Sequence, residues 1–338
     1  MSYRKKNRKK KKRWLVPVCA GGVTAAVLAG MAVHAVYTGR TVQTGTVAKT
    51  DTTDPDTVIW QGKEYVYNND LSNYLMIGVD KEDIEETSAG QANAGQADAI
   101  YLVVRDRREN TVTLISIPRD TMTEIELIAP GGESLGTDVN HINLSYAYGD
   151  GAHESCRLTE EAVSNLLYGI PIQSYCAVSM EALPILTESV GSLTVTVPND
   201  SMTEDYPDYA QGEEITLTPE NTEIFIRYRN TAQSQSALDR LERQQEFLKS
   251  YGEAAKQKYG ENPQYAVDLY EALIPYMTTS MGSDEFVRLA ESLATGNTET
   301  GWTIPGEGVE GADYDEYHVD DDALYEKIIE TFYKEAGS

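Results

Sequence analysis

The chain has 338 residues, of which 41% are hydrophobic and 22 are tyrosines, and its formal net charge is −26. This apolar content can fill a substantial core, so a fully disordered chain is excluded. Residues 4–13 carry nine basic side chains, and removing their charge leaves −35 for the rest of the chain. Such an acidic body repels a phosphate backbone, and we therefore expect no general binding of nucleic acid.

Residues 14–37 follow this basic tail and contain no Asp, Glu, Lys or Arg over 24 positions. A helix of that length, at about 1.5 Å per residue, exceeds the roughly 30 Å hydrocarbon core of a bilayer. We expect a single-pass anchor in the cell membrane, with residues 1–13 as a cytoplasmic tail and the C-terminal part outside the cell. The alternative is a cleaved signal peptide, because residues 33–35 loosely fit a small-residue cleavage site, although the apolar run is long for one.

Residues 38–57 are rich in Thr, Asp and Gly, which predicts a flexible stalk. Over residues 58–338, strand-like and helical patterns alternate, and this is typical of one α/β domain. Strands are predicted, in chain order, at residues 73–79, 99–104, 111–117 and 193–197. Helices are predicted at residues 158–167, 180–190, 239–258, 263–276, 283–295 and 321–333. Loops are predicted at residues 81–97, 128–140 and 199–214, and residues 224–228 form either a strand or a helix end.

Cys156 and Cys176 are the only cysteine pair outside the predicted anchor, since Cys19 lies within it. An oxidising exterior permits a disulfide between them, and the sequence leaves that question open. The chain has no zinc-type Cys/His spacing, no phosphate-binding P-loop and no G-x-S-x-G motif, which argues against those three chemistries.

Charged residues flank the first three predicted strands. Asp80 follows the first strand, Asp98 precedes the second, and Arg119 follows the third. If residues 105–110 close an antiparallel hairpin, position 98 lies opposite about position 118, so Asp98 and Arg119 should meet. If the first strand runs parallel to the third, Asp80 reaches the same edge, where open α/β sheets bind ligands. The alternative is a surface salt bridge or a turn cap.

A second group of basic residues follows later in the chain. In an extended segment Arg227 and Arg229 point the same way, and two guanidinium forks suit the oxygens of a diphosphate. On the next helix, side chains spaced i, i+3 and i+7 share one face, namely Ala237, Arg240 and Gln244. Arg243 should instead pair with Asp239, four positions earlier. The alternative is a solvated helix face with ion pairs.

In their order and spacing, these motifs resemble the LytR-CpsA-Psr family over about residues 73–250. The motifs that carry the resemblance are residues 73–80, Asp98, residues 116–120, 141–143 and 227–229, and residues 240–245. The C-terminal part, residues 260–338, is similar to the ending of clostridial-type members. The resemblance implies a mixed β-sheet sandwiched between helices, with an apolar channel for a lipid tail that helices after residue 158 could line.

By this resemblance, the protein is a membrane-anchored phosphotransferase that moves a polyprenyl-pyrophosphate-linked glycopolymer, such as teichoic acid or capsule, onto peptidoglycan. The alternative is a non-catalytic polyprenyl-phosphate-binding scaffold or regulator of cell-envelope assembly. Asp80 and Asp98 match the acids that hold Mg²⁺, and Asp98 and Arg119 match catalytic residues. The residues that match pyrophosphate ligands are Arg119, Arg227, Arg229, Arg240 and Gln244. The glycopolymer, the acceptor hydroxyl and the oligomeric state are left open.

Two positions depart from the family pattern. Gln96 stands where the family usually has Arg, two residues before the second acid. Ala237 stands where it usually has Asp, three residues before the helix Arg, and Asp239 is displaced from that position. Because transfer needs a base or an orienting carboxylate for the incoming hydroxyl, the departures imply slow or specialised turnover, or binding without transfer.

Overall fold

The computed structural model of the protein describes residues 56–337, apart from residues 85, 92, 231–232, 299–300 and 313. The predicted cytoplasmic tail, the anchor and nearly all of the stalk lie outside the described residues. Thr57, predicted as the last residue of the stalk, is the first residue of strand β1 (Thr57–Trp60). In the described part of the chain, no helix combines the length and the apolar character that crossing a bilayer requires.

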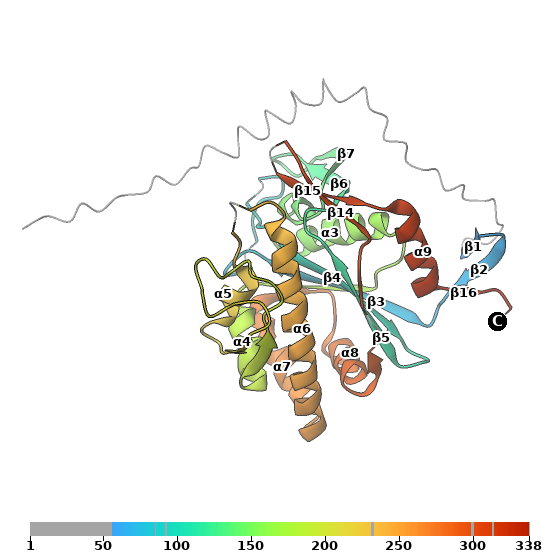
Figure 1. The fold of residues 1–338 in the computed structure, drawn as a ribbon. Coiled ribbons are helices and arrows are strands. Elements are labelled where there is room, and N and C mark those ends of the chain that lie inside the picture. Colours follow the sequence, from blue (N-terminus) through green and yellow to red (C-terminus); the bar gives the residue numbers. More distant parts are fainter. Residues whose placement is uncertain are drawn as a thin grey trace, which may run out of the picture. The chain divides into compact units, whose positions relative to one another are not determined.

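A mixed sheet forms the centre of the fold (Figure 1). In the described residues it has seven strands, in the order β11-β8-β3-β4-β5, with β12 and β13 both alongside β5. Their bounds are β3 (Leu71–Val79), β4 (Ala97–Asp106), β5 (Thr111–Ile117), β8 (Ser174–Val178), β11 (Met277–Thr279), β12 (Asn297–Thr298) and β13 (Trp302–Thr303). β4 is antiparallel to both β3 and β5, and β8 is parallel to β3. The three leading strand predictions are therefore confirmed, and β3 runs parallel to β5.

Helices cover both faces of this sheet, which explains why its central strands are apolar on both sides. Leu75 and Ile77 on β3 belong to the core that α3 (His153–Leu166) and α9 (Asp321–Phe332) complete. Tyr74, which points the other way, packs with α8 (Ser283–Thr295). The long helix α6 (Ser236–Glu261) lies on the α8 side (Figure 1). The arrangement implied by the resemblance, a mixed sheet between helices, is confirmed.

A second apolar cluster lies beside α6, away from the central core. Its buried residues come from β9 (Leu193–Thr196), β10 (Glu214–Leu217), the segment between these strands, α5 (Thr222–Arg227) and α6 itself. Next to it, α4 (Ala182–Val190) packs against α7 (Tyr265–Leu273), which continues into the 3-10 helix η1 (Ile274–Tyr276). The segment 224–228 is thus resolved as a helix end, one of its two predicted alternatives.

The prediction of a loop at residues 128–140 is wrong. β7 (Ser134–His141) pairs antiparallel with β6 (Met122–Ile128), and the short helix α2 (Leu144–Ala147) follows. Most of β7 is solvent-exposed, so it lacks the apolar alternation by which a half-buried strand is recognised. A second hairpin, β14 (Gly306–Glu310) with β15 (Asp315–Val319), lies next to β6.

The two described cysteines are both free thiols. Cys156 on α3 belongs to the core on the α3 face of the sheet. Cys176 is paired in register with Met76, and its chain neighbour Ala177 faces the α3 core, so Cys176 points to the opposite face. The sheet separates the two sulfur atoms, and the disulfide that the sequence permitted is not formed in this structure.

Candidate functional site

The predicted meeting of strand-end charges is present in the structure. In the β4–β5 hairpin Ile100 pairs with Ile117, which brings position 98 opposite position 119. The Asp98 carboxylate forms an ion pair with Arg119 through Oδ1 and with Arg240 Nη1, at 2.5 Å, through Oδ2. Only 11% of the Asp98 side chain is exposed, so water screens these contacts weakly.

Asp80 lies at the same edge, directly after β3. Its Oδ1 accepts a hydrogen bond from the backbone N–H of Gln96 at 2.5 Å. Gly95 adopts φ +91°, and a Cβ there would lie 3.0 Å from Asp80 Oδ1, so glycine permits this close approach. Burial raises the pKa of Asp80, and the nearby negative charge of Asp98 raises it further.

Asp80 and Asp98 are neighbouring carboxylates, and the pKa of Asp80 is raised. A cation between them would stabilise the ionised form of both. The described residues contain no group of three or more His, Cys, Asp or Glu side chains arranged for a metal. Mg²⁺ commonly takes one or two carboxylates and completes its shell with phosphate oxygens and water. Asp80 and Asp98 therefore fit Mg²⁺ in the presence of a phosphate ligand rather than a cage made by protein alone.

Gln96, one of the two departures, takes part in this network as a hydrogen-bond acceptor. Its Oε1 accepts from Arg119 Nη2 at 2.6 Å and from Asn143 Nδ2 at 3.0 Å. Asn143 is buried, and its own Oδ1 has no partner. The side chains of Gln96 and Asn143 hold Arg119 in place, a role that sequence reasoning missed because its only signal was the position of Asn143 within a motif.

The arginines of α6 have two different roles. Arg240 is 4% exposed and donates Nη1 to Asp98, while its Nη2 has no partner. Arg243 does not form the predicted ion pair with the Asp239 carboxylate. Its guanidinium instead donates to the backbone carbonyls of Phe225, at 2.9 Å, and Tyr228. Because it is fully buried and ties α6 to the end of α5, Arg243 supports the site without lining it.

Arg227 and Arg229 do not lie together on one extended strand, the alternative in which their side chains would point the same way. Arg227 is the last residue of α5, where the packing of Phe225 and Ile226 against α6 favours helix over strand. Arg227 Nη1 donates to Glu223 Oε1 at 2.5 Å, and Arg229 Nε donates to Ser236 Oγ at 3.1 Å. Arg227 therefore reaches the site from a helix end, whereas Arg229 lies in the loop that follows and is not among the residues that line the cavities.

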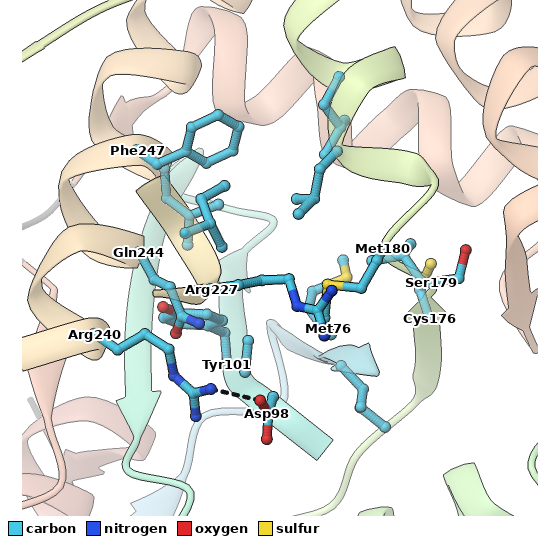
Figure 2. A pocket seen from close by; sticks show the side chains of 18 residues that line it. Met76, Asp98, Tyr101, Cys176, Ser179, Met180, Arg227, Arg240, Gln244 and Phe247 are labelled. Carbon is cyan, nitrogen blue, oxygen red and sulfur yellow. Dashed lines mark hydrogen bonds and ion pairs between the residues drawn. The ribbon is translucent and has the colours of Figure 1, made fainter. Parts of the chain in front are cut away.

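An apolar pocket of about 160 Å³ lies beside these charges (Figure 2). Its apolar lining comes mainly from β3, β4, β8, α4, α5 and α6, including Met76, Cys176, Leu183 and Phe247. Its polar lining residues are Asp98, Tyr101, Ser179, Arg227, Arg240 and Gln244. Of the helices that the resemblance suggested as a lining, α4, α5 and α6 contribute to the pocket, whereas α3 belongs to the core.

A second, polar cavity adjoins the first and shares Arg227 with it. It has a volume of about 380 Å³ and is lined by Asp80, Lys81, Glu82, Asp83 and Arg227. Arg227 thus stands between an apolar pocket and a polar cavity. Such a layout suits a ligand with a hydrocarbon part, a charged junction and a polar part.

Comparison with known proteins adds to this geometry. The sequence matches the LytR_cpsA_psr family over residues 35–331. It is similar to the polyisoprenyl-teichoic acid–peptidoglycan teichoic acid transferase TagU of Bacillus licheniformis, with 30% identity over 163 residues, 48% of this chain and 45% of that protein. TagU of Bacillus subtilis is 29% identical over 165 residues, 48% of this chain and 46% of that protein. The chain therefore spans about half the length of the curated relatives it matches.

Three solved structures share the fold at 20% identity. Protein gbs0355 of Streptococcus agalactiae has a TM-score of 0.61 and covers 79% of this chain and 90% of its own. TagV of B. subtilis has a TM-score of 0.58, covering 78% of this chain and 98% of its own. TagT bound to LI-WTA also has a TM-score of 0.58, covering 78% and 90%. The family match extends over most of the sequence, and the chain belongs to the LytR_cpsA_psr family.

Proposed function

We propose that the protein transfers a glycopolymer from a polyprenyl-pyrophosphate carrier onto peptidoglycan. The observation that carries the proposal is the apolar pocket with arginines at its polar end, where Arg240 Nη2 is buried without a partner. A buried unpaired donor is costly, and an anionic ligand would satisfy it. The names of the TagU relatives describe the same kind of transfer, from a polyisoprenyl-linked teichoic acid to peptidoglycan.

In this proposal the hydrocarbon tail occupies the pocket and the diphosphate lies against Arg119, Arg227, Arg229, Arg240 and Gln244. A peptidoglycan hydroxyl attacks the phosphorus that carries the glycopolymer. The new oxygen–phosphorus bond forms as the bridging oxygen–phosphorus bond breaks, polyprenyl phosphate leaves, and the hydroxyl proton passes to a carboxylate of the site. Arg119 stabilises the developing charge, and Asp98 fixes Arg119 and Arg240 in position.

Asp80 and Asp98 would hold Mg²⁺ together with diphosphate oxygens, and the ion would neutralise part of the ligand's charge. The proposed location is the outer face of the cell membrane, with residues 14–37 as a single-pass anchor and the N-terminus in the cytoplasm. This placement rests on the sequence, and it puts the site on the side where peptidoglycan is found.

The direct test is a single-turnover assay of the full chain in detergent, with Mg²⁺, a lipid-linked glycan and a peptidoglycan fragment. We expect covalent attachment of the glycan to the fragment, and a loss of at least 10²-fold in the Arg240→Ala variant. Arg157→Ala is the matched control, because Arg157 is a half-exposed arginine on α3 that pairs only with surface glutamates. Absence of product from a protein that binds the lipid would leave only the scaffold function.

The scaffold alternative is favoured by one observation, namely that Ala237 lies buried one turn before Arg240, where the family pattern has Asp. An Asp there could provide the base or orienting carboxylate that transfer needs. We expect Ala237→Asp combined with Gln96→Arg, which restores the family pattern, to raise the single-turnover rate by roughly 10²-fold. Lipid affinity should hardly change. An equal or lower rate in the double variant would show that other residues already perform these roles.

A further inference from the structure

Among the described residues, three that line the pocket have a buried polar atom without a partner. Two of these atoms are Nη2 of Arg240 and the hydroxyl oxygen of Tyr101, a β4 residue that is 6% exposed. Ser179 Oγ also has no partner, but its side chain points away from Arg227 and the centre of the pocket in Figure 2. Figure 2 places Tyr101 on the α6 side of the pocket, the side from which Arg240 and Gln244 also project.

A purely hydrocarbon occupant would leave both donors unsatisfied, because an isoprenoid chain has no acceptor atoms. Desolvation raises the pKa of Tyr101, so its hydroxyl keeps its proton and can donate. Arg240 lines the same pocket, and its positive charge lowers the pKa of Tyr101 by less than burial raises it. An occupant that satisfies both groups must bring hydrogen-bond acceptors inside the pocket, and negatively charged oxygens are the strongest acceptors for such donors.

We infer that Tyr101 is a further ligand of the diphosphate. Its hydroxyl donates a hydrogen bond to the phosphate nearest the lipid, and this phosphate enters the pocket instead of stopping at its polar end. This inference rests on the function proposed above. With Gln96 in place of an Arg, the site has one fewer cationic donor than the family pattern, and the Tyr101 hydroxyl supplies a neutral donor. Tyr101 positions the ligand and takes no proton from it.

The test compares Tyr101→Phe with wild type in the full chain, using farnesyl diphosphate and farnesol as probes of the headgroup and of the tail. We expect Tyr101→Phe to weaken binding of farnesyl diphosphate by about ten- to a hundredfold. Its affinity for farnesol should stay the same or increase, and its melting temperature should not fall, because the variant removes an unpaired buried hydroxyl. If the hydroxyl had only a structural role, its removal would lower the melting temperature and weaken the binding of both probes alike.

The matched control is Tyr74→Phe, since Tyr74 is an equally buried tyrosine on β3 that packs toward α8 and does not line the pocket. It should bind both probes like wild type. Unchanged binding of farnesyl diphosphate by Tyr101→Phe, or an equal loss for both probes, would overturn the assignment of Tyr101 alone. Wild-type protein that fails to bind farnesyl diphosphate at all would overturn the proposed function, and this inference with it.

Discussion

Asp98 is the residue on which the site depends. Its two carboxylate oxygens hold Arg119 from the neighbouring strand and Arg240 from a helix 142 positions away in the sequence. Arg119 also pairs with Asp120 at 3.1 Å, and these charges lie in a nearly dry environment, where an ion pair is strong only if its geometry is complete. Nη2 of Arg240, which is buried and has no partner, is therefore held on a fixed guanidinium at the pocket, and a ligand meets a prepared site.

The arginines at the pocket should contribute unequally to ligand binding. We expect Arg240→Ala to weaken farnesyl diphosphate binding by about 3 kcal/mol and Arg227→Ala by about 1.5 kcal/mol, the two ends of the range for hydrogen bonds to charged groups. The Arg227 side chain is 42% exposed and already paired with Glu223, so water and that partner reduce its contribution. Titration calorimetry would measure both losses, with Arg157→Ala as the control. Equal losses of binding free energy in the two variants would contradict the expectation that the buried arginine contributes more than the exposed one.

Asp80 should destabilise the protein when ionised. Its pKa is raised in the folded state, so the stability it contributes is present below the ordinary value of 3.8 and lost as pH rises through the raised pKa. We expect Asp80→Asn to melt higher than wild type at pH 7, with the difference growing as pH rises from acid. The same variant should lose Mg²⁺-dependent binding of the diphosphate. Thermal melts of both proteins at several pH values test this expectation. A lower melting temperature of Asp80→Asn than of wild type at pH 7 would contradict it.

At the scale of elements, α6 connects the pocket with the end of α5 and with the central sheet. One face of α6 presents Arg240 and Gln244 to the pocket, while Arg243 binds the carbonyls that end α5. Gln245 extends the contact to the sheet, donating to Ser116 Oγ on β5 at 3.0 Å. The position of α6 over the sheet therefore decides where Arg240 lies and, through the end of α5, where Arg227 lies.

Arg243→Ala should accordingly damage stability and binding together. Removing the guanidinium leaves two backbone carbonyls without their donor and opens a cavity, at a cost of about 3 kcal/mol or more. Because the end of α5 would lose its tie to α6, Arg227 should also lose its position. We expect a lower denaturation midpoint and weaker farnesyl diphosphate binding, both without change in Arg157→Ala. A stable variant with wild-type affinity would mean that α5 is held by its apolar contacts alone.

At the scale of the molecule, the two ends of the described chain meet in one small sheet. β2 (Lys63–Tyr67) pairs with β1 on one side and with β16 (Tyr333–Glu335) on the other. The backbone N–H of Asn68 also bonds to the carbonyl of Phe332 at 2.8 Å. This pairing closes the fold through contacts that do not involve the predicted anchor.

We therefore expect a fragment spanning residues 56–338 to fold on its own and to unfold in one cooperative transition. Ending the same fragment after Phe332 removes β16 and should lower its melting temperature. Circular dichroism melts of the two fragments measure both effects. An insoluble longer fragment, or one without a cooperative transition, would show that the preceding segment contributes to the fold.

The sequence by itself determined the elements whose pattern is local. The three strands β3, β4 and β5 of the central sheet and helices such as 283–295 follow from apolar spacing within a few residues, whereas β8, β11, β12 and β13 were not predicted. The contact between Asp98 and Arg119 followed from one hairpin, because antiparallel register is set by neighbouring strands. The order and spacing of the motifs also indicated the family and singled out Asp80, Arg240 and Gln244 as candidate site residues.

Only the tertiary structure decided what depends on packing between distant segments. Arg227 ends a helix because α5 is buried against α6, and Arg243 turns inward because two carbonyls there need a donor. Gln96 is held by Arg119 and Asn143, which are distant in the sequence, and Tyr101 faces a pocket whose other walls come from separate strands and helices. Local patterns reflect each residue's immediate neighbours, whereas a pocket forms where separate elements meet, and nothing within one element specifies which others it will meet.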